Sequence, residues 1–163
     1  MIIRRERPGD QAAIRAVTTA AFDRPVEADL VDQLRLDPGW VPALSFVATA
    51  ATKVIGHVVA TRGAVDGSPA LGLGPLSVHP DHQRARVGSA LVRTVIGAAS
   101  ALDESLIAVL GDPEYYFRFG FRLGEELGIA PPVAEWRPHF QVHALAAEVP
   151  SGTFTYAEPF NRL

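Results

Sequence analysis

The stretch "ALGLGPLSVHPDHQRARVGSALV", residues 70–92, contains the strongest structural pattern of the chain. Its apolar residues alternate up to Leu73 and alternate again from Leu76, but the spacing across Gly74-Pro75 is three residues instead of two. A slip of this kind at a Gly-Pro pair is typical of a β-bulge, because proline has no N–H to donate to the ladder. The pattern therefore predicts a bulged strand whose neighbouring backbone N–H groups can turn toward a ligand.

A helix is predicted directly after this strand, from Val87 to Leu102, because apolar residues recur along it at helical spacing. The first N–H groups of a helix have no partner within it, and the helix dipole favours an anion at that end. Gly88 permits close approach to the backbone, Ser89 offers a hydroxyl, and Arg84 and Arg86 add positive charge. The turn is a candidate phosphate site, although its spacing alone equally allows an ordinary connection with a solvated basic face.

The segments on either side predict further strands and helices. An edge strand at residues 1–6 is followed by a helix that Asp10 is placed to cap and that carries Phe22, and then by a helix at 26–36. A hairpin at 43–61, a buried strand at 105–111, a short helix at 112–119, a mostly irregular segment after residue 120, and terminal strand candidates at 140–149 and 152–160 complete the order. This order predicts an α/β fold with a mixed sheet and helices on both faces.

Length and composition limit the classes of protein that fit. At 163 residues and 48% hydrophobic residues, the chain is expected to form a single domain over residues 1–163. A net charge of −3 and a pI near 5.9 argue against a nucleic-acid partner. The chain has no cysteine, which excludes disulfides and cysteine-ligated metals but leaves the compartment open. No signal-like or membrane-spanning apolar run is visible, so we expect a cytoplasmic protein without a membrane partner.

Two motifs resemble the GNAT superfamily of N-acetyltransferases. The segment "PLSVHPDHQRARVGSALV" resembles that family's acyl-coenzyme A (CoA) signature, with Gln83, Gly88 and Ala90 framing the match. The segment "LGDPEYYFRFGF" resembles its Tyr-x-x-x-Gly-Phe element, matched by Tyr116 and the Gly120-Phe121 pair. Together with "GTFTYAEPF" near the C-terminus, these segments are similar to a YhbS-like subgroup. The resemblance implies a GNAT-like acyl-CoA N-acyltransferase fold, with a twisted, mostly antiparallel sheet and a bulged, splayed middle strand.

The resemblance also implies an activity and a site. The expected enzyme transfers an acetyl group from acetyl-CoA to a primary amine of a small molecule or peptide, and releases CoA. The backbone N–H of Leu76 would polarise the thioester carbonyl, and Ser77 and Val78 would hold the pantetheine arm. Tyr116 would act as general acid toward the departing thiolate. The pyrophosphate would be held by the turn made of Gln83, Arg84, Ala85, Arg86, Val87, Gly88 and Ser89.

The chain departs from the family at Arg86, where glycine is usual. A side chain there either crowds the pyrophosphate or points to solvent and adds a charge. Because of this departure, a non-catalytic acyl-CoA-binding or regulatory module on the same fold is the alternative function. A small α/β protein that binds another phosphorylated ligand at this turn is a more remote alternative.

Several features stay open at this point. The general base is one of Glu27, His57, His79 and Asp112, or a water molecule. The histidine pairs lack the spacing and partners of a zinc site, so we expect no metal. The acceptor pocket is expected between the first two helices and the loop after Phe121, where Trp40, Trp136 and Phe140 either line it or pack in the core. Either a monomer or a homodimer is compatible with the sequence.

Overall fold

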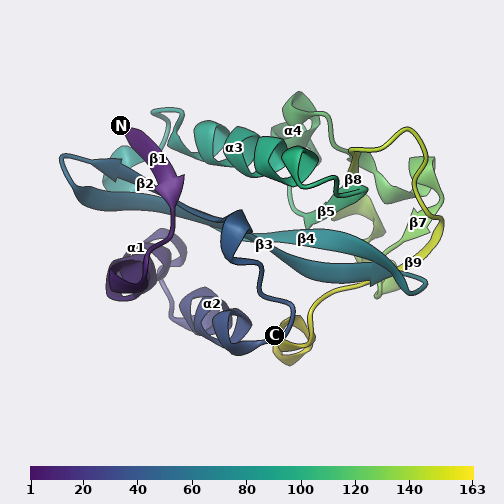
Figure 1. Cartoon of the computed structure of the whole chain (residues 1–163), viewed down its shortest axis with the longest axis horizontal. Coiled ribbons are helices and arrows are strands. Elements are labelled where there is room, and N and C mark those ends of the chain that lie inside the picture. Colours follow the sequence, from purple (N-terminus) through teal and green to yellow (C-terminus); the bar gives the residue numbers. More distant parts are fainter.

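The computed structural model describes all residues from 1 to 163 and contains nine strands and four α-helices (Figure 1). The strands are β1 (Ile2–Arg5), β2 (Ser45–Ala50), β3 (Lys53–Val65), β4 (Ser68–Val78), β5 (Leu106–Leu110), β6 (Arg122–Leu123), β7 (Ile129–Ala130), β8 (Phe140–Ala144) and β9 (Gly152–Thr155). The helices are α1 (Gln11–Phe22), α2 (Val26–Leu36), α3 (Val87–Ala101) and α4 (Pro113–Tyr116). The order of elements predicted from the sequence is confirmed.

The strands form one twisted sheet in the order β1-β2-β3-β4-β5-β8-β6, and β9 pairs with the far end of β3 and with β7. All neighbours are antiparallel except β4 with β5 and β7 with β9. Helices α1 and α2 cover one face, and α3 and α4 cover the other (Figure 1). The predicted fold class, a mostly antiparallel mixed sheet with helices on both faces, is confirmed.

Apolar side chains fill both interfaces between the helices and the sheet. Leu91 and Val95 of α3 are fully buried against sheet residues such as Leu71 and Ile107. On the opposite face, Ile14 of α1 packs with residues of α2 and β2. Burying side chains of this size contributes about 1.5–3 kcal/mol each, so the sheet is firmly held between its two helical layers.

The predicted bulge in β4 is confirmed. Val58 of β3 lies opposite Leu76, whereas Ala60 lies opposite Leu73, so Gly74 and Pro75 together face a single residue of β3. β5 pairs with β4 only along Leu71–Leu73 and separates from it beyond that point. The second half of β4 therefore has a neighbour on its β3 side and an opening on its β5 side.

Two local expectations were wrong. The side chain of Asp10 does not cap α1, because its carboxylate accepts hydrogen bonds from the Arg4 guanidinium at 2.7 and 2.9 Å and from the Arg7 N–H at 2.7 Å. The helix expected over 87–102 ends one residue early, at Ala101. The segment 140–149, a candidate for a strand or a partly irregular course, forms a strand only over Phe140–Ala144. No helix in the structure combines the length and apolar character needed to cross a bilayer.

Candidate functional site

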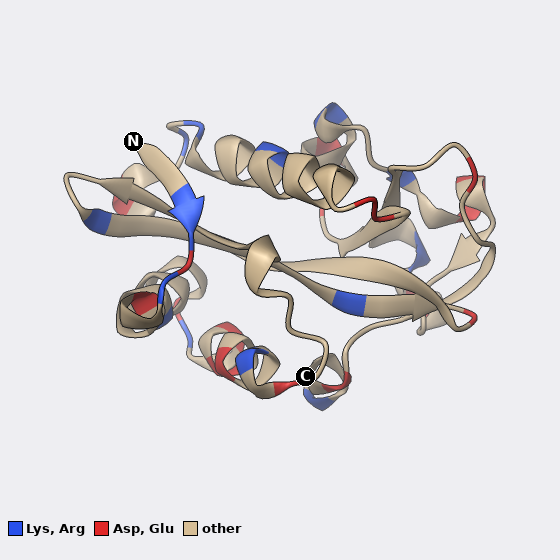
Figure 2. Cartoon of the chain, in the orientation of Figure 1, with Lys and Arg blue, Asp and Glu red and all other residues tan.

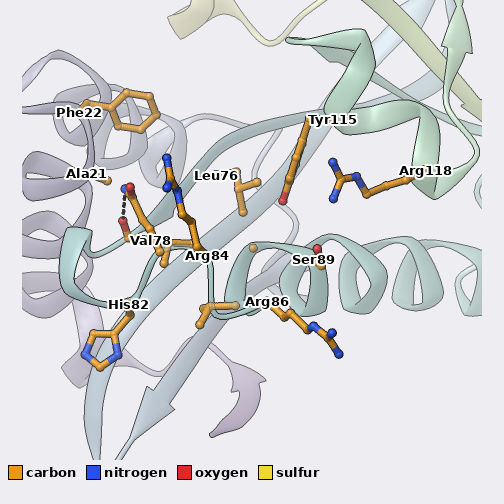
Figure 3. Close-up of a pocket in the computed structure, with 13 residues that line it drawn as sticks. Ala21, Phe22, Leu76, Val78, His82, Arg84, Arg86, Ser89, Tyr115 and Arg118 are labelled. Carbon is orange, nitrogen blue, oxygen red and sulfur yellow. Dashed lines mark hydrogen bonds between the residues drawn. The ribbon is translucent and has the colours of Figure 1, made fainter.

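A cavity of about 510 Å³ opens where β4 and β5 separate, and we call it the basic cavity. Its walls are residues of four segments that converge from different parts of the chain (Figure 3). They are Ala21 and Phe22 at the end of α1, Leu76 and Val78 of β4, His82–Arg84 and Arg86–Ser89 at the start of α3, and Tyr115 and Arg118 beside α4. No acidic residue lines this cavity, so its wall suits an anion.

The backbone of β4 presents donors to the opening. The N–H of His79 donates to the Ile55 carbonyl at 2.8 Å, which marks a hydrogen-bonded residue pair of the antiparallel ladder. Hydrogen-bonded pairs alternate with non-bonded pairs along an antiparallel ladder, so Val78 and Leu76 belong to non-bonded pairs. The N–H and C=O groups of these two residues therefore point away from β3. The side-chain amide of Gln83 reaches the Val78 carbonyl from that side, at 3.1 Å. The Leu76 N–H is thus directed to the open side of the strand, where no β5 residue lies opposite it.

The amino terminus of α3 forms another part of the wall. Its first three residues line the cavity, and no side chain caps the helix. A Cβ atom at Gly88 would lie 2.7 Å from the Tyr115 hydroxyl, so only glycine fits there without displacing Tyr115. Uncapped N–H groups and the helix dipole together favour a negatively charged ligand at this end.

Two arginines of the turn before α3 have left-handed backbone conformations. Arg84 has φ of 61° and Arg86 has φ of 67°, a region that favours glycine. In Figure 3 the Arg84 side chain extends toward Phe22, whereas Arg86 extends in the opposite direction, and both are exposed. The Arg86 side chain therefore adds charge at the rim without filling the space in front of the helix, and Figure 2 shows basic residues gathered at this turn.

A second cavity, of about 600 Å³, lies on the other side of Leu76, and we call it the apolar cavity. Twelve of its sixteen lining residues are hydrophobic. Phe22 and Leu76 line both cavities, so the two spaces adjoin at these residues. The remaining wall comes from α2, β4, β5, α4 and the C-terminal third of the chain, and includes Trp136, Tyr156 and Phe160. The molecule therefore holds two adjoining sites whose junction lies beside the bulged strand.

Tyr116, the expected general acid, lines the apolar cavity and not the basic one. Its ring packs edge-on against Phe121, with centroids 5.5 Å apart, and only 9% of the residue is exposed. Burial raises the pKa of Tyr116 well above its ordinary value, so the phenol stays protonated through the alkaline range. Tyr116 and Leu76 both line this cavity, so a phenol that can donate a proton and the backbone of β4 border the same cavity.

Most of the predicted cofactor-binding residues lie together, but two do not line the basic cavity. Ser77 is 1% exposed, its hydroxyl lies 3.0 Å from that of Thr18, and its peptide group faces β3. Ala85 lies in the turn without contributing to the wall. The sequence reasoning missed Tyr115 and Arg118, whose spacing of three residues on a helical turn could have indicated a shared face. Arg118 stacks over the Tyr115 ring at 4.9 Å.

Only one of the expected base candidates lies in a cavity. Glu27, at the start of α2, lines the apolar cavity and pairs with Arg24. Asp112 caps α4 by accepting from the Glu114 N–H at 2.9 Å, and His79 accepts from the Asp81 N–H at 3.1 Å. His57 of β3 is fully buried, with Nε2 2.9 Å from the Ser45 hydroxyl, and burial lowers its pKa. The structure thus leaves Glu27 as the one of the four that a ligand in either cavity can contact.

Of the three aromatic residues considered for the acceptor pocket, Trp136 lines the apolar cavity. Phe140 is fully buried in the core around β8 and β9. Trp40 packs beside α2, with the Arg35 guanidinium 5.3 Å from its ring centroid.

Comparison with known proteins agrees with this geometry. Residues 42–123 match the model of the acetyltransferase (GNAT) domain family. The uncharacterised N-acetyltransferase YhbS of Escherichia coli is 33% identical over 99% of both chains. Another uncharacterised N-acetyltransferase of Escherichia coli, YjhQ, is 40% identical over 69% of this chain, and the match spans 64% of YjhQ.

Two solved structures resemble this one over nearly their full lengths. The crystal structure of Escherichia coli YhbS in complex with CoA has a TM-score of 0.94 at 32% identity and covers 99% of this chain and 92% of its own. A GNAT family acetyltransferase of Brucella melitensis in complex with acetyl-CoA has a TM-score of 0.83 at 32% identity, over 98% and 97% of the two chains.

Proposed function

Because this chain belongs to the GNAT family of acetyltransferases, we propose that it transfers the acetyl group of acetyl-CoA to a primary amine bound in the apolar cavity. The observation that carries the proposal is the meeting of a basic cavity and an apolar cavity at Leu76, beside the open edge of β4. One cavity suits the phosphates of the donor, and the other suits an acceptor. The transferred group then lies at the junction.

The basic cavity fits acetyl-CoA in charge and in backbone chemistry. The uncapped amino terminus of α3 and the Arg84 and Arg118 side chains would hold the pyrophosphate. The outward peptide groups of Leu76 and Val78 would hold the pantetheine arm as an added strand would. Relatives with 32% identity have been crystallised with CoA and with acetyl-CoA, which supports the same donor here.

The reaction needs a polarised carbonyl and a proton for the leaving group. The neutral amine nitrogen forms a bond to the acetyl carbon, the carbon–sulfur bond breaks, and the nitrogen passes one proton to solvent. The Leu76 N–H would stabilise the negative charge that develops on the carbonyl oxygen. The Tyr116 hydroxyl would donate a proton to the sulfur of CoA, and solvent would then reprotonate Tyr116, so the products are an N-acetyl amide and CoA thiol.

Calorimetric titration with acetyl-CoA and with CoA, followed by assay of thiol release with added amines, tests the proposal. We expect micromolar binding of both, and thiol release that depends on an amine. Absence of binding at millimolar acetyl-CoA would overturn the proposed donor. Binding of acetyl-CoA without thiol release across a broad amine panel would leave the non-catalytic module as the better description.

Replacement Tyr116→Phe tests the acid. Removal of a general acid typically lowers turnover by about 100-fold or more, so we expect that loss in kcat with an unchanged Kd for acetyl-CoA. The contrasting variant Tyr115→Phe removes a hydroxyl that lines the basic cavity, and should change Kd more than kcat. Because the pKa of Tyr116 is raised, kcat should not fall as the pH rises to about 9. Full turnover in the Tyr116→Phe variant would exclude the acid role.

A further inference from the structure

The charge and polarity of the apolar cavity limit which acceptors can bind in it, because few charged groups line it. Its wall includes no lysine, arginine or histidine, and Glu27 is its only acidic residue. Glu27 lies in the first turn of α2 and is 8% exposed. A ligand with one positive charge has a partner here, whereas a carboxylate or a second ammonium group would be desolvated without one.

Both carboxylate oxygens of Glu27 accept hydrogen bonds from the Arg24 guanidinium, whose Nε lies 2.9 and 3.0 Å from them, so a ligand must use the lone-pair positions that Arg24 leaves over. Its partner Arg24 approaches from outside the cavity, does not line it, and keeps 60% of its side chain exposed. A carboxylate has two oxygens and about four lone-pair positions, so it can accept from Arg24 and from a ligand ammonium together. Glu27 therefore offers an anchor, and a first proton acceptor, for an amine that enters as its ammonium form.

Aromatic side chains make up much of the remaining wall. Phe22, Trp136, Tyr156 and Phe160 approach the cavity from α1, from the 3₁₀ turn over Ala134–His139 and from the C-terminal segment. Rings of this kind bind flat apolar groups through burial and through edge-to-face contacts. A hydrophilic chain with several amines or hydroxyls would leave these surfaces and its own polar groups without partners.

One polar atom near this wall lacks a partner. The Tyr156 hydroxyl is buried, and no group of the protein forms a hydrogen bond with it. Buried hydroxyl groups almost always have a partner in native proteins, because an unmade bond costs free energy. Tyr156 lines the cavity, but its hydroxyl has almost no accessible surface, so a polar group on a bound ligand supplies that bond only by displacing the side chains that cover it.

We propose that the acceptor is a small arylalkylamine: a single primary ammonium group at Glu27, an aromatic body among the cavity's rings, and a hydrogen-bonding group that reaches Tyr156. This inference rests on the proposed function, since it names the substrate class of the same reaction. It excludes polyamines, free amino acids and polycationic sugars as good acceptors. The cavity volume of about 600 Å³ falls within the range of sites for small molecules.

Binding without acetyl-CoA is the first test, because it does not depend on transfer. In a Trp40→Phe variant, Trp136 is the only tryptophan and lies in the cavity wall, so its emission reports occupancy. We expect 2-phenylethylamine and tyramine to bind at least about tenfold more tightly than spermidine or lysine, since the latter two desolvate unpaired charges. Tighter binding of spermidine or lysine, or no binding of either arylalkylamine, would overturn the inference.

Matched variants test the two anchors. Glu27→Gln should weaken 2-phenylethylamine about tenfold and leave neutral 2-phenylethanol unchanged, because only the amine carries the charge. Arg24→Gln, which removes the ion pair but keeps the carboxylate, should leave amine binding intact or strengthened. Tyr156→Phe should abolish a preference of about fivefold for tyramine over 2-phenylethylamine. Equal losses for the amine and the alcohol in Glu27→Gln would show a structural effect and overturn the anchor.

Thiol release with acetyl-CoA then separates the two proposals. Tight arylalkylamine binding without thiol release would support the inferred ligand class and overturn the proposed transfer. Thiol release with spermidine or lysine but not with arylalkylamines would support the transfer and overturn the ligand class. Release with arylalkylamines at the lowest KM of the panel supports both.

Discussion

The basic cavity and the apolar cavity are similar in size and share Phe22 and Leu76, yet they are opposite in chemistry. The basic cavity is lined by arginines and an uncapped helix terminus and by no acidic residue. The apolar cavity is lined mainly by hydrophobic residues, with one carboxylate and no cationic side chain. Under the proposed function, this difference would separate an anionic donor from a cationic acceptor by electrostatics as well as by shape.

The largest effect on ligand affinity expected from disturbing one cavity alone comes from Gly88→Ala. The new Cβ would lie 2.7 Å from the Tyr115 hydroxyl, so the Tyr115 side chain would have to shift. Because Tyr115 lines the basic cavity, its displacement should raise the Kd for acetyl-CoA about thirtyfold in calorimetry, which corresponds to about 2 kcal/mol. Amine binding in the apolar cavity should stay the same.

Gly97→Ala is the matched control, because Gly97 lies in the same helix with open space around its Cβ position. It should leave the Kd for acetyl-CoA unchanged and raise the free energy of unfolding by about 0.5–1 kcal/mol, since alanine favours a helix over glycine. Equal Kd values in the two variants would show that Tyr115 and Gly88 do not shape the donor site.

The next largest expected effect is that of ionic strength, which should change the ligand Kd of the basic cavity more than that of the apolar cavity. Raising the salt concentration from about 0.05 to 0.3 M shortens the Debye length, so we expect the Kd for acetyl-CoA to rise about tenfold. Binding of 2-phenylethylamine, governed by apolar contact and one buried carboxylate, should change less than about twofold over this range. Titrations of each ligand at several salt concentrations measure both slopes, and parallel slopes would contradict the electrostatic separation.

The smallest expected effect comes from replacing Arg86, which occupies a position where glycine is usual in the family. Arg86→Ala and Arg86→Gly both remove an exposed charge at the rim, so both should weaken acetyl-CoA binding by about fivefold, or ~1 kcal/mol. Only the glycine variant relieves the left-handed backbone at φ of 67°. Its free energy of unfolding should exceed that of the alanine variant by about 1 kcal/mol in urea titration.

The two cavities also differ in how far the sequence predicts them. Most of the basic cavity comes from one continuous stretch, Leu76–Ser89, so the spacing of its residues is enough to indicate a bulge, a helix terminus and a basic turn. Ser77 is wrongly expected in its wall, because a single sequence does not tell which peptide groups of a strand face the neighbouring strand. That direction depends on the register with β3, which puts Ser77 on the paired side.

The apolar cavity cannot be assembled in the same way. The first two helices and the loop after Phe121 are expected in it, and Phe22, Glu27 and Trp136 do line it. Its other walls come from β4, β5 and the C-terminal segment, which meet only through tertiary packing. Tyr156 and Phe160 lie in a C-terminal segment whose hydrophobic periodicity is weak. No local pattern therefore predicts that this segment packs against α2, as it does in the structure.

The bulged strand also bears on how this molecule can diversify. Because the two cavities share only Phe22 and Leu76, substitutions elsewhere in the acceptor wall leave the donor wall untouched. A descendant could exchange Trp136, Phe160 or their neighbours and acquire a new acceptor while keeping the same donor chemistry. In the proposed reaction, the acceptor wall can therefore change without altering the donor wall, whereas a change that closes the opening beside Leu76 would affect both cavities.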